Sequence, residues 1–207
     1  MLLDELKNNL VKYSKILVDK GLVVSSGGNV SFCKNNKMYV TPTGVVLDEI
    51  KAHNLACVDL DGNRLNEFKP SKESVMHSSI YKSKDVDVII HAHPYYTTIL
   101  ASHKNIKKGK DIPLYTPGYA VKVGEVGLVD YYPPGSRELS QAVTEEISNK
   151  NAVLMKKHGV IVSADDFRTA LNLIEDIELN SRMYVEYNND IEPLTEKELN
   201  ELLNSGY

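Results

Sequence analysis

Short β-type runs alternate with helical segments along the chain, and this alternation limits the fold more than any other feature. Helical spacing of apolar residues marks 6–17 and 167–177, and helix-start signals follow Pro70, Pro94 and Gly135. The β-type runs are 30–33, 38–41, 56–59, 86–91, 152–155 and 160–162. Interleaved strands and helices predict a layered domain of α/β or α+β class.

Composition narrows the class of protein further. The 207 residues contain no internal repeat and no linker-like tract, so we expect a single domain over 1–207. Two cysteines, Cys33 and Cys57, are too few for a disulfide scaffold or a zinc finger, and both fall in strand-like runs, where small core residues are usual. A net charge of −4 argues against non-specific binding to nucleic acid or to a membrane surface.

The chain shows neither a targeting signal nor a membrane segment. Acidic and polar residues interrupt the leucines of the first 17 residues, unlike a signal peptide. No apolar run approaches the roughly 20 residues needed to cross a bilayer. We therefore expect a soluble, cytoplasmic protein.

Three local features bear on the site. The small residues of 25–29 predict a loop. After Pro70 we predict a helix with Ser71 as N-cap and Glu73 in its first turn. Thr195 and Glu198 are spaced as a capping box for a short last helix.

Two of the six histidines form the most informative pattern. His91 and His93 end an apolar strand, and residues two apart on a strand point to the same face, so both rings can reach one ion. A catalytic zinc usually takes three protein ligands and keeps a fourth position open. His158, in the turn after the run 152–155, is the best third ligand. The pattern alone is equally compatible with buried histidines that only form hydrogen bonds.

Glu73 is the candidate acid/base residue. A carboxylate in the first turn of a helix is favoured by the helix dipole, so Glu73 could serve the helix start alone. Beside a Lewis acid, the same carboxylate can take a proton from a carbon next to a carbonyl. A nearby cation would keep it ionised, and it could ligate the metal until substrate displaces it.

A set of backbone amides, hydroxyls and one ammonium is suited to an anion such as phosphate. These groups come from the loop 27–29, the turn 41–44 and the pair Ser71-Lys72. None of the three segments matches a nucleotide-binding fingerprint.

Six motifs in this order resemble the class II aldolase family, most closely the fuculose-1-phosphate aldolase type. They cover nearly the whole chain: Ser26-Gly27-Gly28-Asn29-Val30-Ser31, Thr41-Pro42-Thr43-Gly44, Pro70-Ser71-Lys72-Glu73, His91-Ala92-His93-Pro94, Gly135-Ser136-Arg137-Glu138-Leu139 and His158-Gly159-Val160. The resemblance implies an α/β fold of three αβα layers with a central, mostly antiparallel sheet. It also implies a homotetramer with active sites at subunit interfaces.

The resemblance further implies a site. Zn²⁺ or another divalent ion would be held by His91, His93 and His158, with Glu73 as the acid/base residue. The phosphate-binding positions fall on Gly28, Asn29, Thr43, Gly44, Ser71 and Lys72. Position 72 is often a second serine in the family, so Lys72 is a departure there. A proton-donating tyrosine is also implied, and the candidates are Tyr115, Tyr119 and Tyr207.

The implied reaction is reversible cleavage of a ketose 1-phosphate to dihydroxyacetone phosphate and a small aldehyde such as lactaldehyde, through a zinc-stabilised enediolate. A pentulose-phosphate 4-epimerase is one alternative, although such epimerases tend to have His-Gly-Pro where this chain has His158-Gly159-Val160. A methylthioribulose 1-phosphate dehydratase is another. A non-catalytic scaffold domain is disfavoured, because such domains would be expected to lose the ligands that this chain keeps.

Overall fold

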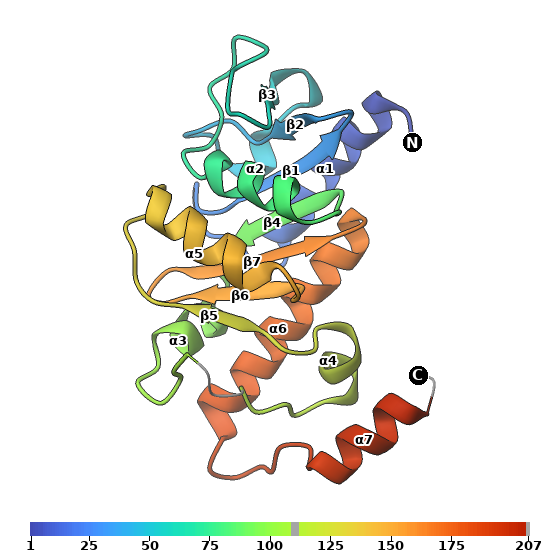
Figure 1. Cartoon of the computed structure of the whole chain (residues 1–207), viewed down its shortest axis with the longest axis vertical. Helices are drawn as coiled ribbons and strands as arrows, with labels where there is room; N and C mark the ends of the chain where they lie inside the picture. The colour runs from blue at the N-terminus through green and yellow to red at the C-terminus, as the bar shows by residue number, and fades with distance from the viewer. Residues whose placement is uncertain (109–111, 206–207) are drawn as a thin grey trace.

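A seven-stranded sheet runs through the middle of the molecule, in the order β3-β2-β1-β4-β7-β6-β5 (Figure 1). The computed structural model describes residues 1–108 and 112–205. The strands are β1 Asn29–Lys34, β2 Lys37–Val40, β3 Ala56–Asp59, β4 Val88–Ala92, β5 Gly127–Val129, β6 Ala152–Met155 and β7 Gly159–Ala164. Neighbouring strands are antiparallel except for the parallel pair β5 and β6.

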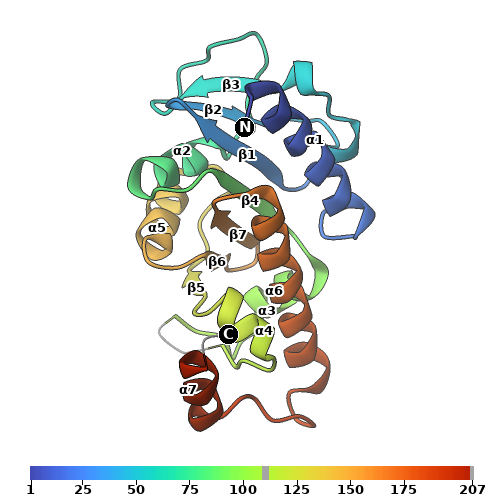
Figure 2. The same cartoon turned by 90° about the vertical axis from the view of Figure 1, so that its right-hand side faces the viewer.

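Helices cover both faces of this sheet, which confirms the expected three layers (Figure 2). The α-helices are α1 Leu3–Asp19, α2 Ser74–Ser83, α3 Tyr95–Ser102, α4 Pro117–Lys122, α5 Arg137–Ile147, α6 Phe167–Tyr187 and α7 Glu196–Asn204, with short 3-10 helices η1 Leu47–Glu49 and η2 Ala52–Asn54. Alternate side chains of β4 point to opposite faces of the sheet. Ile89 packs in one buried cluster with residues of α2 and α5, and Ile90 packs in another with residues of α1 and α6.

Strand register places the site at one end of β4. Asn29 of β1 pairs with His91 of β4, so both side chains point to the face covered by α2. On the other side of β4, Ala92 pairs with Val160 of β7. The β6–β7 hairpin closes where Met155 pairs with Gly159, and Lys157 in its turn has a φ of 58°. His158 is the next residue, so this turn brings His158 to the end of β4.

The start of α2 differs from the prediction that Ser71 is its N-cap. The helix begins at Ser74, and Glu73 itself occupies the N-cap position. Pro70 bridges to Pro42, and the Ser71 amide donates to the Thr41 carbonyl, so the chain remains extended through Ser71. The Ser71 hydroxyl instead accepts from the Glu73 amide at 3.3 Å in a turn that precedes the helix.

Of the other local predictions, one helix cap is confirmed and one loop residue is misplaced. The capping box of Thr195 and Glu198 is confirmed at α7. Asn29, predicted in a loop, is the first residue of β1. The sequence pattern did not predict α4 and β5, which are only 6 and 3 residues long.

Within the described residues, no helix is both long and apolar enough to cross a membrane.

Candidate metal and catalytic site

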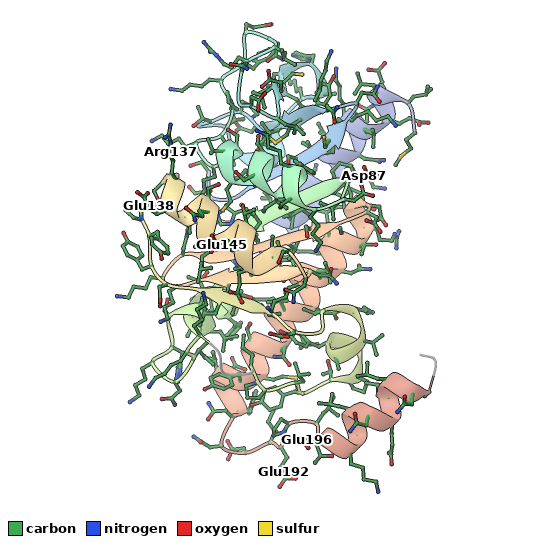
Figure 3. The ribbon with its side chains drawn as sticks, viewed as in Figure 1. Asp87, Arg137, Glu138, Glu145, Glu192 and Glu196 are labelled. Atoms are coloured by element: carbon green, nitrogen blue, oxygen red, sulfur yellow. The ribbon has the colours of Figure 1, made fainter. Side chains whose placement is uncertain are left out.

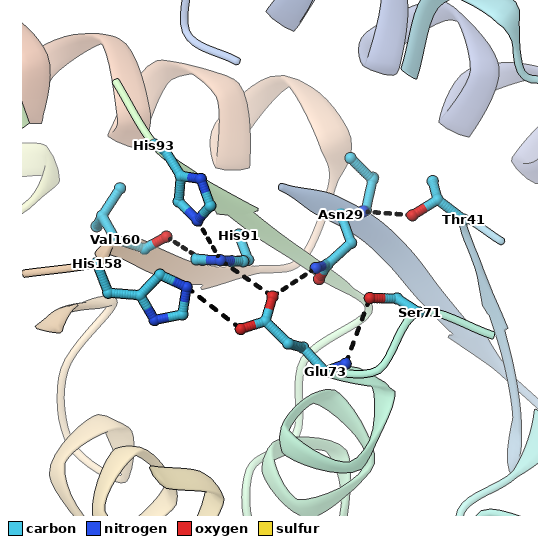
Figure 4. A network of polar contacts seen from close by, with 9 residues as sticks. Asn29, Thr41, Ser71, Glu73, His91, His93, His158 and Val160 are labelled. Carbon is cyan, nitrogen blue, oxygen red and sulfur yellow. Dashed lines mark hydrogen bonds and ion pairs between the residues drawn. The ribbon is translucent and has the colours of Figure 1, made fainter. Parts of the chain in front are cut away.

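Three histidines from two neighbouring strand ends meet in one cluster (Figure 4). His91 lies on β4, His93 follows that strand, and His158 lies in the β6–β7 turn. One nitrogen from each ring lies within 4.8 Å of the others, and the Nε2 atoms of His91 and His93 are 2.8 Å apart. The structure therefore brings together the three residues that the sequence singled out.

Two glycines make this close approach of strand ends feasible. A Cβ on Gly159 would lie 2.4 Å from the Ala92 carbonyl oxygen and 2.6 Å from Cδ2 of His93. A Cβ on Gly28, whose φ is +78°, would lie 2.7 Å from the His91 carbonyl oxygen. Any larger residue at either position would push against the backbone that carries the histidines.

The donor set fits a divalent metal ion. The Val160 carbonyl can only accept a hydrogen bond, so the His91 Nδ1 at 2.9 Å donates to it, and the neutral ring keeps its Nε2 lone pair for a ligand. Zn–N bonds of about 2.0–2.1 Å place two nitrogens on one ion within roughly 4.2 Å of each other. Small side-chain shifts would therefore let all three rings bind one ion.

Electrostatics favour the neutral form of two of the three rings, His93 and His158. Burial, reinforced by the charge of His91, lowers the pKa of His158 to about 4. Burial and the charges of His91 and His158 lower the pKa of His93 to about 3. Burial opposes a charge on His91 too, but the Glu73 carboxylate outweighs it and raises the pKa of His91. The same carboxylate would favour a metal cation there.

Glu73 reaches this cluster from the helical layer. Its Oε2 lies 3.2 Å from Nε2 of His91, and its Oε1 lies 3.4 Å from Nε2 of His158. The Asn29 side-chain amide donates to Oε2 at 2.9 Å. Burial would raise the pKa of Glu73, but His91, His158 and Asn29 outweigh it and hold that pKa well below its usual range. An ionised, largely buried carboxylate beside the cluster can accept a proton.

The candidate phosphate-binding segments also meet near Glu73. The Thr43 amide donates to the Lys69 carbonyl, which ties the turn 41–44 to the segment before Ser71. Gly44 and Lys72 are exposed, whereas Asn29 is buried with no hydrogen-bond partner for its Oδ1 among the described residues. Asn29 and Ser71 thus contact Glu73, the turn 41–44 is tied to the segment before Ser71, and contact of these residues with phosphate stays a prediction.

The tyrosine candidates lie apart from the histidines within one chain. Tyr119 is buried and lines an apolar cavity of about 790 Å³ with residues of β5 and α7. Tyr115 packs against the core cluster on the α6 side of the sheet. Tyr207 lies outside the described residues. Tyr119 is buried within its own chain and Tyr115 lies on the α6 side of the sheet, so neither is placed to donate a proton to the histidines of its own chain.

Sequence reasoning gave no role to one buried histidine near the site. His77 is on α2, four residues after Glu73, and is fully buried. Its Nδ1 lies 2.7 Å from the Ser31 hydroxyl. The spacing of four residues between Glu73 and His77 could have indicated that both lie on one face of the predicted helix.

Comparison with known proteins identifies the family. The model of the class II aldolase and adducin N-terminal domain matches residues 8–185. The chain belongs to this family. It is 31% identical over 203 residues to a 3-oxo-tetronate 4-phosphate decarboxylase of Haemophilus influenzae, covering 97% of both chains. It is 34% identical over 178 residues to an L-fuculose phosphate aldolase of Methanocaldococcus jannaschii, covering 86% of this chain and 94% of the relative.

Solved structures of the class II aldolase family share the fold along almost the full chain. YgbL of Klebsiella pneumoniae, described as an aldolase, epimerase or decarboxylase, superposes with a TM-score of 0.92 at 32% identity, covering 98% of this chain and 99% of that one. An L-fuculose 1-phosphate aldolase superposes with a TM-score of 0.87 at 31% identity, covering 97% and 95%.

Proposed function

We propose that this family member is a divalent-metal-dependent lyase that reversibly cleaves a ketose 1-phosphate, similar to fuculose 1-phosphate. The products would be dihydroxyacetone phosphate and a small aldehyde such as lactaldehyde. The observation that carries the proposal is the contact of the Glu73 carboxylate with His91 and His158, at 3.2 and 3.4 Å. Similarity to L-fuculose phosphate aldolases supports the same reaction.

The residues divide the chemistry between them. His91, His93 and His158 would hold the ion, and three nitrogen ligands suit Zn²⁺. A bound divalent ion would act as a Lewis acid that stabilises negative charge on substrate oxygens. In cleavage, the carbon–carbon bond breaks and one proton moves, in sum, from the ketose hydroxyl to C3 of dihydroxyacetone phosphate. Glu73 is the group that gives or takes the proton at C3.

A decarboxylation is the second candidate, favoured by the relative that matches 97% of this chain. A 3-oxo acid that loses CO₂ leaves its electron pair on the carbon beside the ketone. For 3-oxo-tetronate 4-phosphate, protonation of that carbon gives dihydroxyacetone phosphate, so Glu73 would have the same task. Lys72, next to Glu73, offers an additional cation for a substrate with both a carboxylate and a phosphate.

The assembly forms part of the proposal. We propose a homotetramer with active sites at subunit interfaces, as the resemblance to class II aldolases implies; the half-buried Tyr115, on the α6 side of the sheet, would then donate its proton to the site of a neighbouring copy. Light scattering of the purified protein tests this, and a monomer that retains full activity would contradict it.

One parallel assay separates the candidate reactions. Metal-analysed protein is offered fuculose 1-phosphate, ribulose 1-phosphate, ribulose 5-phosphate and 3-oxo-tetronate 4-phosphate, and dihydroxyacetone phosphate and CO₂ are followed. Release from a ketose 1-phosphate, abolished by a chelator and restored by zinc, supports the aldolase. Release only from the 3-oxo acid, with CO₂, supports the decarboxylase. Xylulose 5-phosphate formed from ribulose 5-phosphate without release would instead indicate the epimerase.

A further inference from the structure

Two polar rows face each other where α2 packs on β1. Glu73, His77 and Tyr81 are spaced four residues apart along α2 and its N-cap, so they share one helix face. Asn29 and Ser31 are two apart on β1 and share one face of the sheet. The first pair across this boundary is the hydrogen bond from Asn29 to Glu73.

The second contact across the boundary is a three-residue network in which Ser31 and His77 are fully buried and Tyr81 is partly buried. The Ser31 hydroxyl lies 2.7 Å from Nδ1 of His77 and 2.8 Å from the Tyr81 hydroxyl. The Tyr81 hydroxyl also donates to the Asp87 carbonyl at 3.4 Å. Figure 3 shows Asp87 near the C-terminal end of α2, the end opposite to Glu73. The network therefore anchors α2 behind the site rather than in it.

The three side chains are neutral at pH 7. Burial and the charge of His91 lower the pKa of His77 to about 3, and burial raises the pKa of Tyr81 well above its ordinary value. Their contribution is therefore directional hydrogen bonding, not charge. Apolar packing of α2, through residues such as Met76 and Ile80, is non-directional. A slide of α2 that unpaired the buried Ser31 or His77 would be penalised.

The site depends on this register because its parts come from different layers. The histidines are carried by the sheet and its hairpin, whereas Glu73 is carried by the start of α2. A misplacement of about 1 Å between reacting groups can lower a rate about 100-fold. We propose that the Ser31–His77–Tyr81 network fixes the register of α2 on β1 and so positions the Glu73 carboxylate. His77 is thus a positioning residue, and its effect on turnover rests on the proposed function.

Matched variants on α2 and β1 test this role. Ser31→Ala removes the hydroxyl that both partners use, and His77→Leu removes the ring nitrogens. His77→Asn restores a polar group close to the position of Nδ1, and Tyr81→Phe removes only the far hydroxyl. The control is Ser78→Ala, a buried serine on the same helix whose hydroxyl contacts Met38 Sδ at 3.9 Å. For each variant kcat, KM, bound metal and melting temperature are measured.

We expect Ser31→Ala and His77→Leu to lower kcat about 10–100-fold with KM and metal content within about twofold of wild type. His77→Asn should recover most of this loss, Tyr81→Phe should lose less, and Ser78→Ala should match wild type. A lower melting temperature with unchanged kcat in Ser31→Ala, His77→Leu and Tyr81→Phe would overturn the proposal. If His77→Leu fails to fold, Ser31→Ala and Tyr81→Phe decide the question.

A measurement without substrate keeps this proposal separate from the proposed function. Crystal structures of Ser31→Ala and His77→Asn give the distance between Glu73 Oε2 and His91 Nε2, which is 3.2 Å in the wild type. We expect it to lengthen by about 0.5 Å or more in Ser31→Ala and to stay unchanged in His77→Asn. An unchanged distance in Ser31→Ala would refute the positioning role, whichever substrate the protein uses. If wild type cleaves no offered substrate, the proposed function fails and this distance still decides the role of the network.

Discussion

The Glu73 carboxylate lies 3.2 Å from the His91 imidazole although the two residues come from different layers of the fold. His91 is the fourth residue of β4, and Glu73 occupies the N-cap position of α2, in the helical layer that packs on the sheet. The proposed metal ligands and the proposed proton-transfer group therefore lie on separate elements. A variant in one element should disturb one function more than the other.

His91→Ala should abolish tight metal binding, because it removes the Nε2 ligand of His91. The hydrogen bond from Nδ1 to the Val160 carbonyl fixes the tautomer of this ring and leaves Nε2 free to bind an ion. The stoichiometry of zinc in protein dialysed against a weak chelator measures this. His53→Ala, at an exposed histidine of η2, is the matched control and should keep its zinc. Zinc retained by His91→Ala at the wild-type level would mean that the ion is held elsewhere.

Gly159→Ala should destabilise the fold by about 1–3 kcal/mol, since overpacking a tight contact typically costs that much. The new methyl group would lie 2.4 Å from the Ala92 carbonyl oxygen and 2.6 Å from His93 Cδ2. We also expect weaker metal binding because His93 must move. Gly118→Ala is the control, since its Cβ would meet only Lys122 Nζ at 3.9 Å. Urea unfolding measures the free energy of unfolding of both variants. Equal values for Gly159→Ala and Gly118→Ala would contradict the close approach of Gly159 to Ala92.

Stability of the metal-free protein should fall as pH drops from about 6.5 toward 3. Burial and the charge of His91 hold the pKa of His77 at about 3, whereas an unfolded histidine titrates near 6.5. In that window the unfolded state binds a proton on His77 that the native state rejects, so His77 alone lowers the free energy of unfolding by up to about 1.4 kcal/mol per pH unit. Above about pH 6.5 this contribution vanishes.

Denaturant unfolding at pH values between about 3 and 6.5 measures how steeply the free energy of unfolding changes with pH. His77→Asn cannot titrate there, so its slope should be smaller than that of wild type, while His53→Asn at the exposed site should leave the slope unchanged. Identical slopes for wild type and His77→Asn would show that His77 is not the group responsible.

Lys72→Ser should raise the KM for a phosphorylated substrate about tenfold with little change in kcat, as expected for loss of one charge-assisted contact. Lys72 is exposed beside Glu73, in the turn that follows Ser71. Steady-state kinetics on the substrate found by the parallel assay checks this, with Lys69→Ser at another exposed lysine as the control. An unchanged KM would remove Lys72 from the substrate site.

The interleaving of strands and helices predicted a layered domain, whereas the three-layer arrangement was implied by the resemblance to class II aldolases. Local spacing singled out His91, His93 and His158 as candidates for one cluster, and the resemblance added their role as metal ligands. The spacing of His91 and His93 on a strand determines that they share a face, and Gly159 after His158 marks the turn that completes the cluster. These features depend on local chain geometry, so the sequence carries them directly.

The elements that the sequence pattern did not predict correctly depend on contacts between residues far apart in the chain. Pro70 bridges to Pro42, a residue 28 positions away, and this keeps Ser71 out of the helix that it was predicted to cap. Asn29 looked like part of a small-residue loop, yet its pairing with His91 makes it part of β1. Strand β5 has 3 residues and exists because β6 pairs with it in parallel.

Proton exchange at C3 of dihydroxyacetone phosphate tests the central claim most directly, because it needs no knowledge of the aldehyde or of the acid that is decarboxylated. The metal-loaded protein is incubated with dihydroxyacetone phosphate in D₂O and exchange is followed by NMR. We expect wild type to exchange one C3 hydrogen and to stop when a chelator is added. Glu73→Gln should bind metal normally and exchange about 10²–10⁴-fold more slowly. Wild-type rates in Glu73→Gln, or no exchange in metal-loaded wild type, would contradict the role assigned to Glu73.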